Sequence, residues 1–150
     1  MNYRQKQVMV NKVIHKFGEI LNDKTFAVWG LAFKPETDDM REAAAITIIN
    51  ELTKRGAKIK AYDPKAVNEA KRCYLKDNKS VEYMDSKYDA LNDADALILV
   101  TEWKEFRSPD FIEMAKRLKN KCIFDGRNQY KIKTLKNFGF EYEQIGVKKI

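Results

Sequence analysis

Gly30-Leu31-Ala32-Phe33-Lys34-Pro35-Glu36-Thr37-Asp38-Asp39-Met40-Arg41-Glu42 joins a short apolar run to a helical pattern. The apolar run, residues 26–29, lies between Lys24 and Gly30 and is typical of a buried strand. Apolar side chains follow the quoted stretch at helical spacing, at Ala45, Ile48, Ile49 and Leu52. The order predicted is therefore a strand, a glycine turn and a helix.

The ends of this helix have their own signals. Asp39 and Glu42 have the spacing of a capping pair, which predicts a helix start at about residue 41. Gly56 predicts its end as a C-terminal cap. The turn before this helix carries the cations Lys34 and Arg41. Because a helix N-terminus has unpaired N–H groups and a partial positive charge, the turn is a candidate anion cradle.

Short apolar runs and helical patterns alternate along the rest of the chain. Strands separated by helices of this length predict a mostly parallel sheet with helices on both faces. The fold class expected is thus α/β, a Rossmann-like doubly wound domain. The predicted strands are residues 26–29, 59–62, 81–83, 96–101, 122–124 and 140–144, and the predicted helices are residues 41–55, 66–75, 88–91, 109–118 and 132–138.

A further helix is predicted at the start of the chain, from about residue 3 to residue 21. It carries one apolar stripe, formed by Val10, Val13, Ile14, Phe17 and Leu21. Two interpretations stay open. The stripe packs on the edge of its own domain, or it is partly exposed and pairs with another copy of the chain.

Length and composition limit the class of protein. One hundred and fifty residues fit one domain, and 44% hydrophobic residues with three prolines argue against a disordered chain. The sequence has neither an apolar run long enough to cross a bilayer nor a secretory signal, so we expect no membrane partner and a cytoplasmic location. The net charge is +7, but the lysines are scattered and no nucleic-acid-binding motif accompanies them. We therefore expect no nucleic-acid partner.

The cysteines do not indicate nucleophilic catalysis or a metal site. Cys73 and Cys122 lie far apart, and the single histidine, His15, is in the first helix. Cys122 opens an apolar run and is expected in a buried strand, whereas Cys73 lies in a polar helix and is expected to be partly exposed. A Cys/His pair, a disulfide and a metal site are not expected.

Three further motifs follow the quoted stretch. They are Tyr62-Asp63-Pro64, Thr101-Glu102-Trp103 followed by Glu105-Phe106-Arg107, and Asp125-Gly126-Arg127-Asn128. In this order they resemble the C-terminal, nucleotide-sugar-binding domain of the UDP-glucose/GDP-mannose dehydrogenase family, across residues 25–128. The Thr-Glu-Trp and Asp-Gly-Arg-Asn motifs are more similar to its UDP-glucose branch.

The resemblance implies roles for four residues. Phe33 and Lys34 would contact the UDP-sugar, Arg127 would bind UDP-glucose, and Arg41 would reach the pyrophosphate of NAD. Each has an ordinary alternative. Lys34 would be an exposed loop lysine, Arg41 a first-turn arginine paired with Asp38 or Glu42, and Arg127 a local ion pair with Asp125. A guanidinium suits phosphate or uracil oxygens because its geometry is bidentate.

Two marked residues stay outside the expected site. Asp63 resembles an acid that binds ribose, but a turn-forming Asp-Pro is the favoured interpretation. Trp103 would stack on a ligand or pack in the core. No role is assigned to Glu102.

The family's dinucleotide motif, G-x-G-x-x-G, does not occur in this sequence, nor does the segment that carries its catalytic cysteine. We therefore expect no catalytic residue here. Residues 1–22 would be the end of an interdomain helix and residues 23–150 the UDP-sugar-binding domain. The parent would oxidise UDP-glucose to UDP-glucuronate with two NAD, as a homodimer with NAD-binding and central domains. The alternatives are a stand-alone nucleotide-sugar-binding module and a dehydrogenase of a related UDP-sugar.

Overall fold

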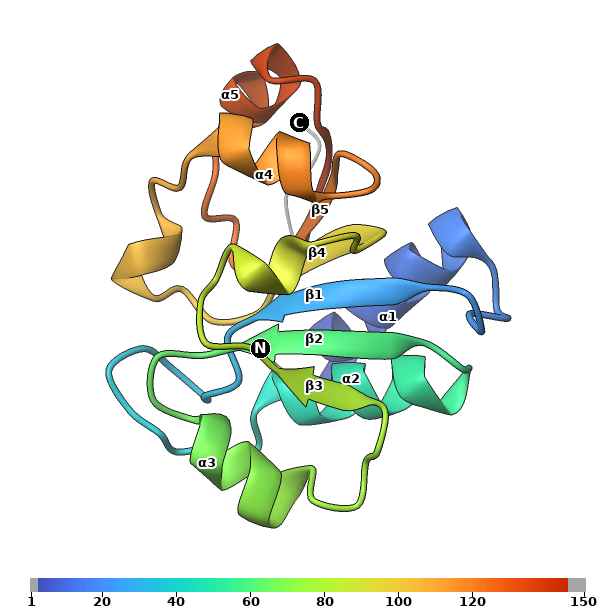
Figure 1. Ribbon diagram of the computed structural model, residues 1–150, viewed down its shortest axis with the longest axis vertical. Helices are drawn as coiled ribbons and strands as arrows, with labels where there is room; N and C mark the ends of the chain where they lie inside the picture. The colour runs from blue at the N-terminus through green and yellow to red at the C-terminus, as the bar shows by residue number, and fades with distance from the viewer. Residues whose placement is uncertain (1–2, 146–150) are drawn as a thin grey trace.

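The computed structural model of the protein describes residues 3–145 (Figure 1). The outer ends of the predicted segments 1–22 and 23–150 therefore lie outside the described residues. Its strands are β1 Thr25–Trp29, β2 Lys58–Tyr62, β3 Val81–Tyr83, β4 Ala96–Leu99, β5 Cys122–Asp125 and β6 Glu141–Gln144. Its helices are α1 Tyr3–Phe17, α2 Ala44–Lys54, α3 Val67–Glu69, η1 Ala70–Tyr74, η2 Asp89–Leu91, η3 Lys104–Phe106, α4 Phe111–Arg117 and α5 Ile132–Asn137.

The six strands form one parallel sheet in the order β3-β2-β1-β4-β5-β6. The chain builds outward from β1 to β3 and then returns to the other side of β1 to add β4, β5 and β6. This order confirms the predicted Rossmann-like, doubly wound fold. Its direction reverses between β1 and β4, which is the position where such sheets bind ligands.

The central strands are buried because both faces of the sheet are covered. All four residues of β4 and of β5 are buried, as are the last four of β1, the continuous apolar pattern of a parallel sheet. In Figure 1, α1 and α2 lie behind the sheet and η2 lies in front of it. The carboxyl ends of β1, β2 and β3 point to the left of that view.

The start of α2 differs from its prediction. The helix begins at Ala44, and its N-cap residue Ala43 provides no side-chain hydrogen bond. Glu42 has a φ of 58°, outside the right-handed helical region. Asp39 instead accepts hydrogen bonds from Arg41. The predicted capping pair is therefore wrong, because its two members serve the loop and not the helix.

The end of α2 agrees with its prediction. Gly56 has a φ of 100°, and its N–H donates to the carbonyl oxygen of Thr53 at 2.9 Å. The N–H of Ala57 donates to the carbonyl oxygen of Leu52 at 3.2 Å. This is the Schellman arrangement that glycine favours after a helix.

The first helix packs on its own domain. It ends at Phe17 rather than Leu21, where the N–H of Gly18 donates to Ile14. Val10, Val13 and Leu21 are fully buried, and Ile14 and Phe17 are partly buried against the core. The apolar stripe is thus largely covered within the domain, as the first interpretation expects.

Candidate functional site

The loops that follow β1 and β4 meet at the point where the strand order reverses. Gly30 has a φ of 101°, and its N–H donates to the carbonyl oxygen of Tyr62 at 2.8 Å. A Cβ at this position would lie 2.5 Å from Cβ of Thr101. The Thr101 hydroxyl in turn donates to the carbonyl oxygen of Ala32 at 2.7 Å. Glycine is therefore required here for the two loops to approach.

Asp63, directly after β2, binds the backbone of the β1 loop through its side-chain carboxylate. One oxygen, Oδ2, accepts from the backbone N–H of Leu31 at 2.7 Å and of Ala32 at 3.0 Å. The other, Oδ1, accepts from the N–H groups of Lys65 and Ala66, each at 2.8 Å. The side chain is buried. Asp63 is therefore both the turn-forming residue that its Asp-Pro context predicts and an anchor of the β1 loop.

Phe33 and Lys34 are presented to solvent at the tip of this anchored loop. Phe33 is 52% exposed although it is aromatic, and Lys34 is exposed as well. The N–H of Phe33 donates to the carbonyl oxygen of Asp39 at 2.7 Å, which closes the loop. Phe33 also lines an open hollow of about 430 Å³ together with Asp39, Arg41 and Glu42. An exposed ring and a cation on a fixed backbone are suited to ligand contact.

Arg41 lies in the loop before α2, not in its first turn. Its guanidinium pairs with Asp39, through Nε to Oδ1 at 3.1 Å and Nη2 to Oδ2 at 2.8 Å. The predicted alternative partners, Asp38 and Glu42, are therefore incorrect. These hydrogen bonds from Arg41 lower the pKa of Asp39 to about 2. The arginine side chain is 80% exposed.

Arg127, after β5, pairs with Glu102 after β4. Its Nε donates to Oε2 of Glu102, and its Nη2 donates to Oε1 at 3.0 Å. Asp125 does not pair with this guanidinium; it accepts the backbone N–H of Arg127 at 2.9 Å. The predicted Asp125–Arg127 ion pair is therefore wrong, because Asp125 is fully buried and its side chain organises the loop backbone.

The buried carboxylate of Asp125 has three further partners. Oδ2 accepts from the N–H of Gln129 at 2.6 Å and of Tyr130 at 3.2 Å, and from the hydroxyl of Tyr142 at 2.5 Å. Asp125 at the end of β5 and Asp63 after β2 thus have the same structural role. Each uses a buried carboxylate to fix the loop that carries an exposed candidate ligand-binding residue.

The cysteines are as expected from the sequence. Cys73 is exposed, and Cys122 is buried in β5. Burial raises the pKa of the Cys122 thiol to about 12, so it is not a nucleophile at neutral pH. Within residues 3–145, no group of three His, Cys, Asp or Glu side chains is placed to hold a metal ion. In the same residues no helix is both long enough and apolar enough to span a membrane.

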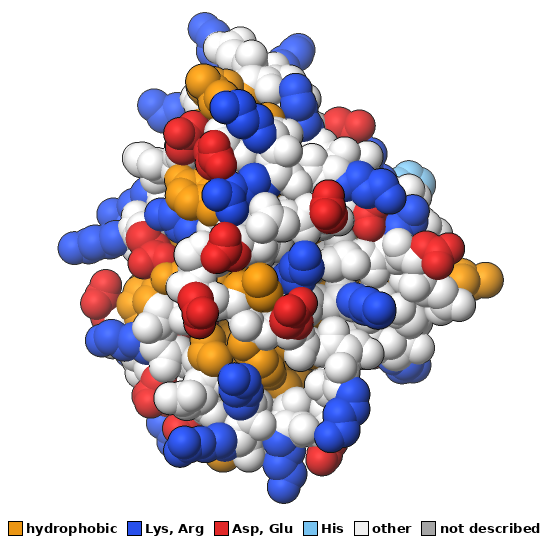
Figure 2. Space-filling model, in the orientation of Figure 1, with side chains coloured by type: hydrophobic (Ala, Val, Ile, Leu, Met, Phe, Trp, Pro, Cys, Tyr) orange, Lys and Arg blue, Asp and Glu red, His pale blue; other side chains and the backbone are white. Residues whose placement is uncertain are grey.

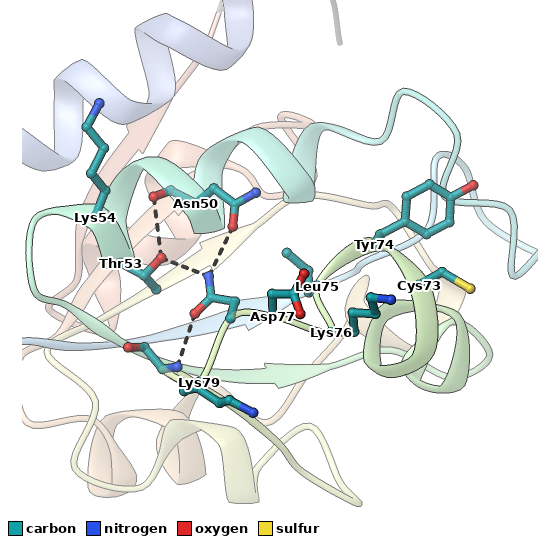
Figure 3. Close-up of a pocket in the computed structure, with 11 residues that line it drawn as sticks. Asn50, Thr53, Lys54, Cys73, Tyr74, Leu75, Lys76, Asp77 and Lys79 are labelled. Atoms are coloured by element: carbon teal, nitrogen blue, oxygen red, sulfur yellow. Dashed lines mark hydrogen bonds between the residues drawn. The ribbon is translucent and has the colours of Figure 1, made fainter.

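Charged side chains do not form a single basic surface on the face shown in Figure 2, where lysines and arginines alternate with carboxylates. A hollow of about 630 Å³ lies between α2 and the segment from Cys73 to Ser80 (Figure 3). Its floor is already hydrogen-bonded: Nδ2 of Asn78 donates to Asn50 at 3.0 Å and to Thr53 at 2.9 Å. These hydrogen bonds join α2 to the segment that contains Asn78, so the hollow is explained as the junction between two neighbouring elements.

The fold is that of a Rossmann-like domain with two anchored loops at the reversal of strand order, and the sequence comparison identifies its family. Residues 27–132 match the UDP-glucose/GDP-mannose dehydrogenase family, UDP binding domain. The match covers most of the chain, so this protein belongs to that family.

Individual relatives agree. The chain is 38% identical to a UDP-glucose 6-dehydrogenase of Pseudomonas aeruginosa, over 97% of this chain and 32% of that protein. It is 37% identical to the enzyme of the same name from Rhizobium meliloti, with the same coverage. Its structure matches a UDP-glucose dehydrogenase from Pyrobaculum islandicum with a TM-score of 0.74 and 26% identity, over 95% of this chain and 29% of that one. The chain thus spans about a third of the length of these relatives.

The expected site residues lie on two of the loops. Phe33, Lys34 and Arg41 share the loop between β1 and α2, and Arg127 follows β5. These two loops are connected through the loop after β4. Arg127 pairs with Glu102, and the hydroxyl of the adjoining Thr101 donates to the carbonyl oxygen of Ala32 in the β1 loop. Sequence reasoning left Glu102 without a role. Its position could have indicated a role, because Glu102 directly follows a predicted buried strand and that strand is adjacent to the one that precedes Arg127.

Proposed function

We propose that this chain is the UDP-sugar-binding part of an NAD-dependent UDP-glucose 6-dehydrogenase, which oxidises UDP-glucose to UDP-glucuronate with two NAD. The observation that carries the proposal is the pair of anchored loops at the strand-order reversal, which present Lys34 and Arg127. The names of the relatives that match almost the whole chain support the substrate. The share of their length that the chain spans is consistent with one domain of such an enzyme.

Each site residue has a proposed part in substrate binding. Phe33 and Lys34 contact the UDP-sugar, the ring through its exposed face and the ammonium as a point charge near the phosphates. Arg127 binds oxygen acceptors of the nucleotide through its planar fork. We assign no catalytic residue to this chain, and by itself it is expected to be inactive.

Arg41 is the residue proposed to reach NAD. A diphosphate requires an accessible cation, and the side chain of Arg41 is 80% exposed. Its pairing with Asp39 uses Nε and Nη2, so the guanidinium keeps further donors for a phosphate. NAD accepts the hydride when it is bound, and Arg41 provides positive charge for its pyrophosphate and orients it. Most of the NAD contacts are proposed to come from a separate NAD-binding domain.

The remaining partners are part of the same proposal. They are the NAD-binding and central domains of the same enzyme and a second copy in a homodimer, in the cytoplasm. Because the apolar stripe of α1 is covered by its own domain, a contact through this helix would use another face. Val8, Asn11 and His15 line a hollow of about 370 Å³ on that face together with Glu143.

Calorimetric titration of the chain with UDP-glucose tests the proposal. The expected result is saturable binding that Lys34→Ala and Arg127→Ala each weaken at least fivefold, a typical loss for a charged contact. Lys133→Ala, which removes an exposed lysine of α5, is the matched control and should bind as the wild type does. Absence of binding, or equal loss in the control, would contradict the proposal. Tighter binding of GDP-mannose would contradict the UDP-glucose branch.

A further inference from the structure

Glu102 meets Arg127 along one edge of the guanidinium. The pair uses Nε and Nη2 of the arginine, which form the side edge of the group. A guanidinium has five N–H donors, and this arrangement occupies two of them. Within the described residues, Nη1 of Arg127 makes no hydrogen bond. The terminal edge of the fork therefore keeps its donors for a ligand.

The backbone fixes both partners before any ligand binds. The N–H of Arg127 donates to the buried Asp125, and the N–H of Gly126 donates to the carbonyl oxygen of Leu99 at 2.8 Å. On the other side, Glu102 lies between the buried residues Thr101 and Trp103. Trp103 is held in turn by its indole hydrogen bond to Asp63 at 3.2 Å. Two fixed loops therefore bring the carboxylate to the arginine.

We propose that Glu102 is a positioning residue for nucleotide binding, which orders Arg127 so that its terminal edge faces the UDP-sugar. This inference rests on the proposed function. It gives a role to a residue that contacts Arg127 rather than the ligand. The alternative is that Glu102 competes with the nucleotide for the arginine, and the two ideas predict opposite changes in affinity.

Magnitudes favour positioning over competition. Ordering one long side chain in advance improves affinity by roughly two- to tenfold. The carboxylate also repels the anionic ligand, but an intervening guanidinium separates the two, and water and salt weaken the repulsion further. The side chains of Arg127 and Glu102 are 34% and 29% exposed, so solvent screening applies. The net effect of the carboxylate is therefore to strengthen binding.

A double-mutant cycle measured by calorimetry with UDP-glucose tests the inference. Glu102→Gln keeps the size of the side chain and removes its charge, and should weaken binding about three- to fivefold. In the Arg127→Ala background the same change should not weaken binding, because no arginine is left to order. Glu105→Gln is the matched control, since it makes the same charge change at an exposed position three residues along.

The outcomes separate the two proposals. If Arg127→Ala weakens binding but Glu102→Gln strengthens it or leaves it unchanged, the positioning role is overturned and the proposed function stands. Equal weakening by Glu102→Gln in both backgrounds would also overturn it, because the effect would not pass through Arg127. If the wild-type chain does not bind UDP-glucose, or Arg127→Ala is without effect, the proposed site itself is overturned.

Discussion

The indole Nε1 of Trp103 donates a hydrogen bond to Oδ2 of Asp63 at 3.2 Å, between residues 40 positions apart in sequence. The same oxygen accepts the N–H groups of Leu31 and Ala32. One buried carboxylate therefore joins the loops after β1, β2 and β4. The exposed side chains of Phe33 and Lys34 depend on this junction for their position, because the loop that carries them is fixed through Leu31 and Ala32.

Replacing Asp63 with asparagine should lower the free energy of unfolding by about 3 kcal/mol, because buried donors lose their acceptor. The carboxylate accepts five N–H donors, three at Oδ2 and two at Oδ1. In either orientation of the amide, at least two backbone N–H groups face an NH₂ group. Urea denaturation of Asp63→Asn measures this loss. Asp85→Asn, an exposed counterpart, should change stability little, and equal stability of the two variants would refute the role of Asp63.

Gly30→Ala should be much more harmful than Gly18→Ala. Both glycines have a positive φ, 101° and 92°, so alanine is strained at either position. At Gly18 a Cβ meets nothing within 4 Å, whereas at Gly30 it lies 2.6 Å from the backbone nitrogen of Thr101. We expect losses of about 1–2 kcal/mol at Gly18 from strain and about 3–5 kcal/mol at Gly30 from strain plus overpacking. Thermal unfolding of the two variants compares them, and similar losses would argue against the close approach of the loops.

The carboxyl group of Asp39 should titrate near pH 2. Hydrogen bonds from Arg41 depress its pKa from 3.8 to about 2. Because the folded-state pKa is lowered, the stabilisation from this pair is present above the unfolded pKa and is lost as the pH falls through 2. Carbon-13 NMR titration of the side-chain carboxyl measures the midpoint. Arg41→Ala should return it toward 3.8, and an unchanged midpoint would show that the pair does not form in solution.

One of the two thiols should react in the folded protein. Cys73 is exposed, whereas Cys122 is buried and burial raises its pKa to about 12. At pH 8 a thiol reagent should therefore modify Cys73 at once and Cys122 after denaturation. Counting released thionitrobenzoate gives one equivalent before denaturant and two after it. Cys73→Ser should give none before denaturant; fast reaction of that variant would show that β5 opens readily.

The sheet was predictable because its signals are local. Residues 81–83 form β3 as predicted, and residues 26–29 form all but the first position of β1. The glycine signal at Gly56 also identified the end of α2, since a positive φ after a helix is a backbone property that sequence shows directly.

The contacts inside the loops were less predictable because they depend on the backbone conformation of each loop and on which strands are neighbours. The sequence around Asp39 also fits a helix-capping pair of Asp39 with Glu42. The observed pairing of Asp39 with Arg41 depends on the left-handed backbone conformation at Glu42. Likewise Asp125 is two residues from Arg127, but the guanidinium pairs with Glu102, 25 residues away. Strand order decides that contact, since β4 and β5 are neighbours.

The most direct test of the account is where UDP binds, mapped by proton–nitrogen NMR of the labelled chain during titration with UDP. The predicted result is that the amide shifts cluster in residues 30–34, 101–103 and 126–128, at the reversal of strand order between β1 and β4. Shifts confined to the hollow between Asn50 and Ser80, or scattered along the surface lysines, would contradict the central claim.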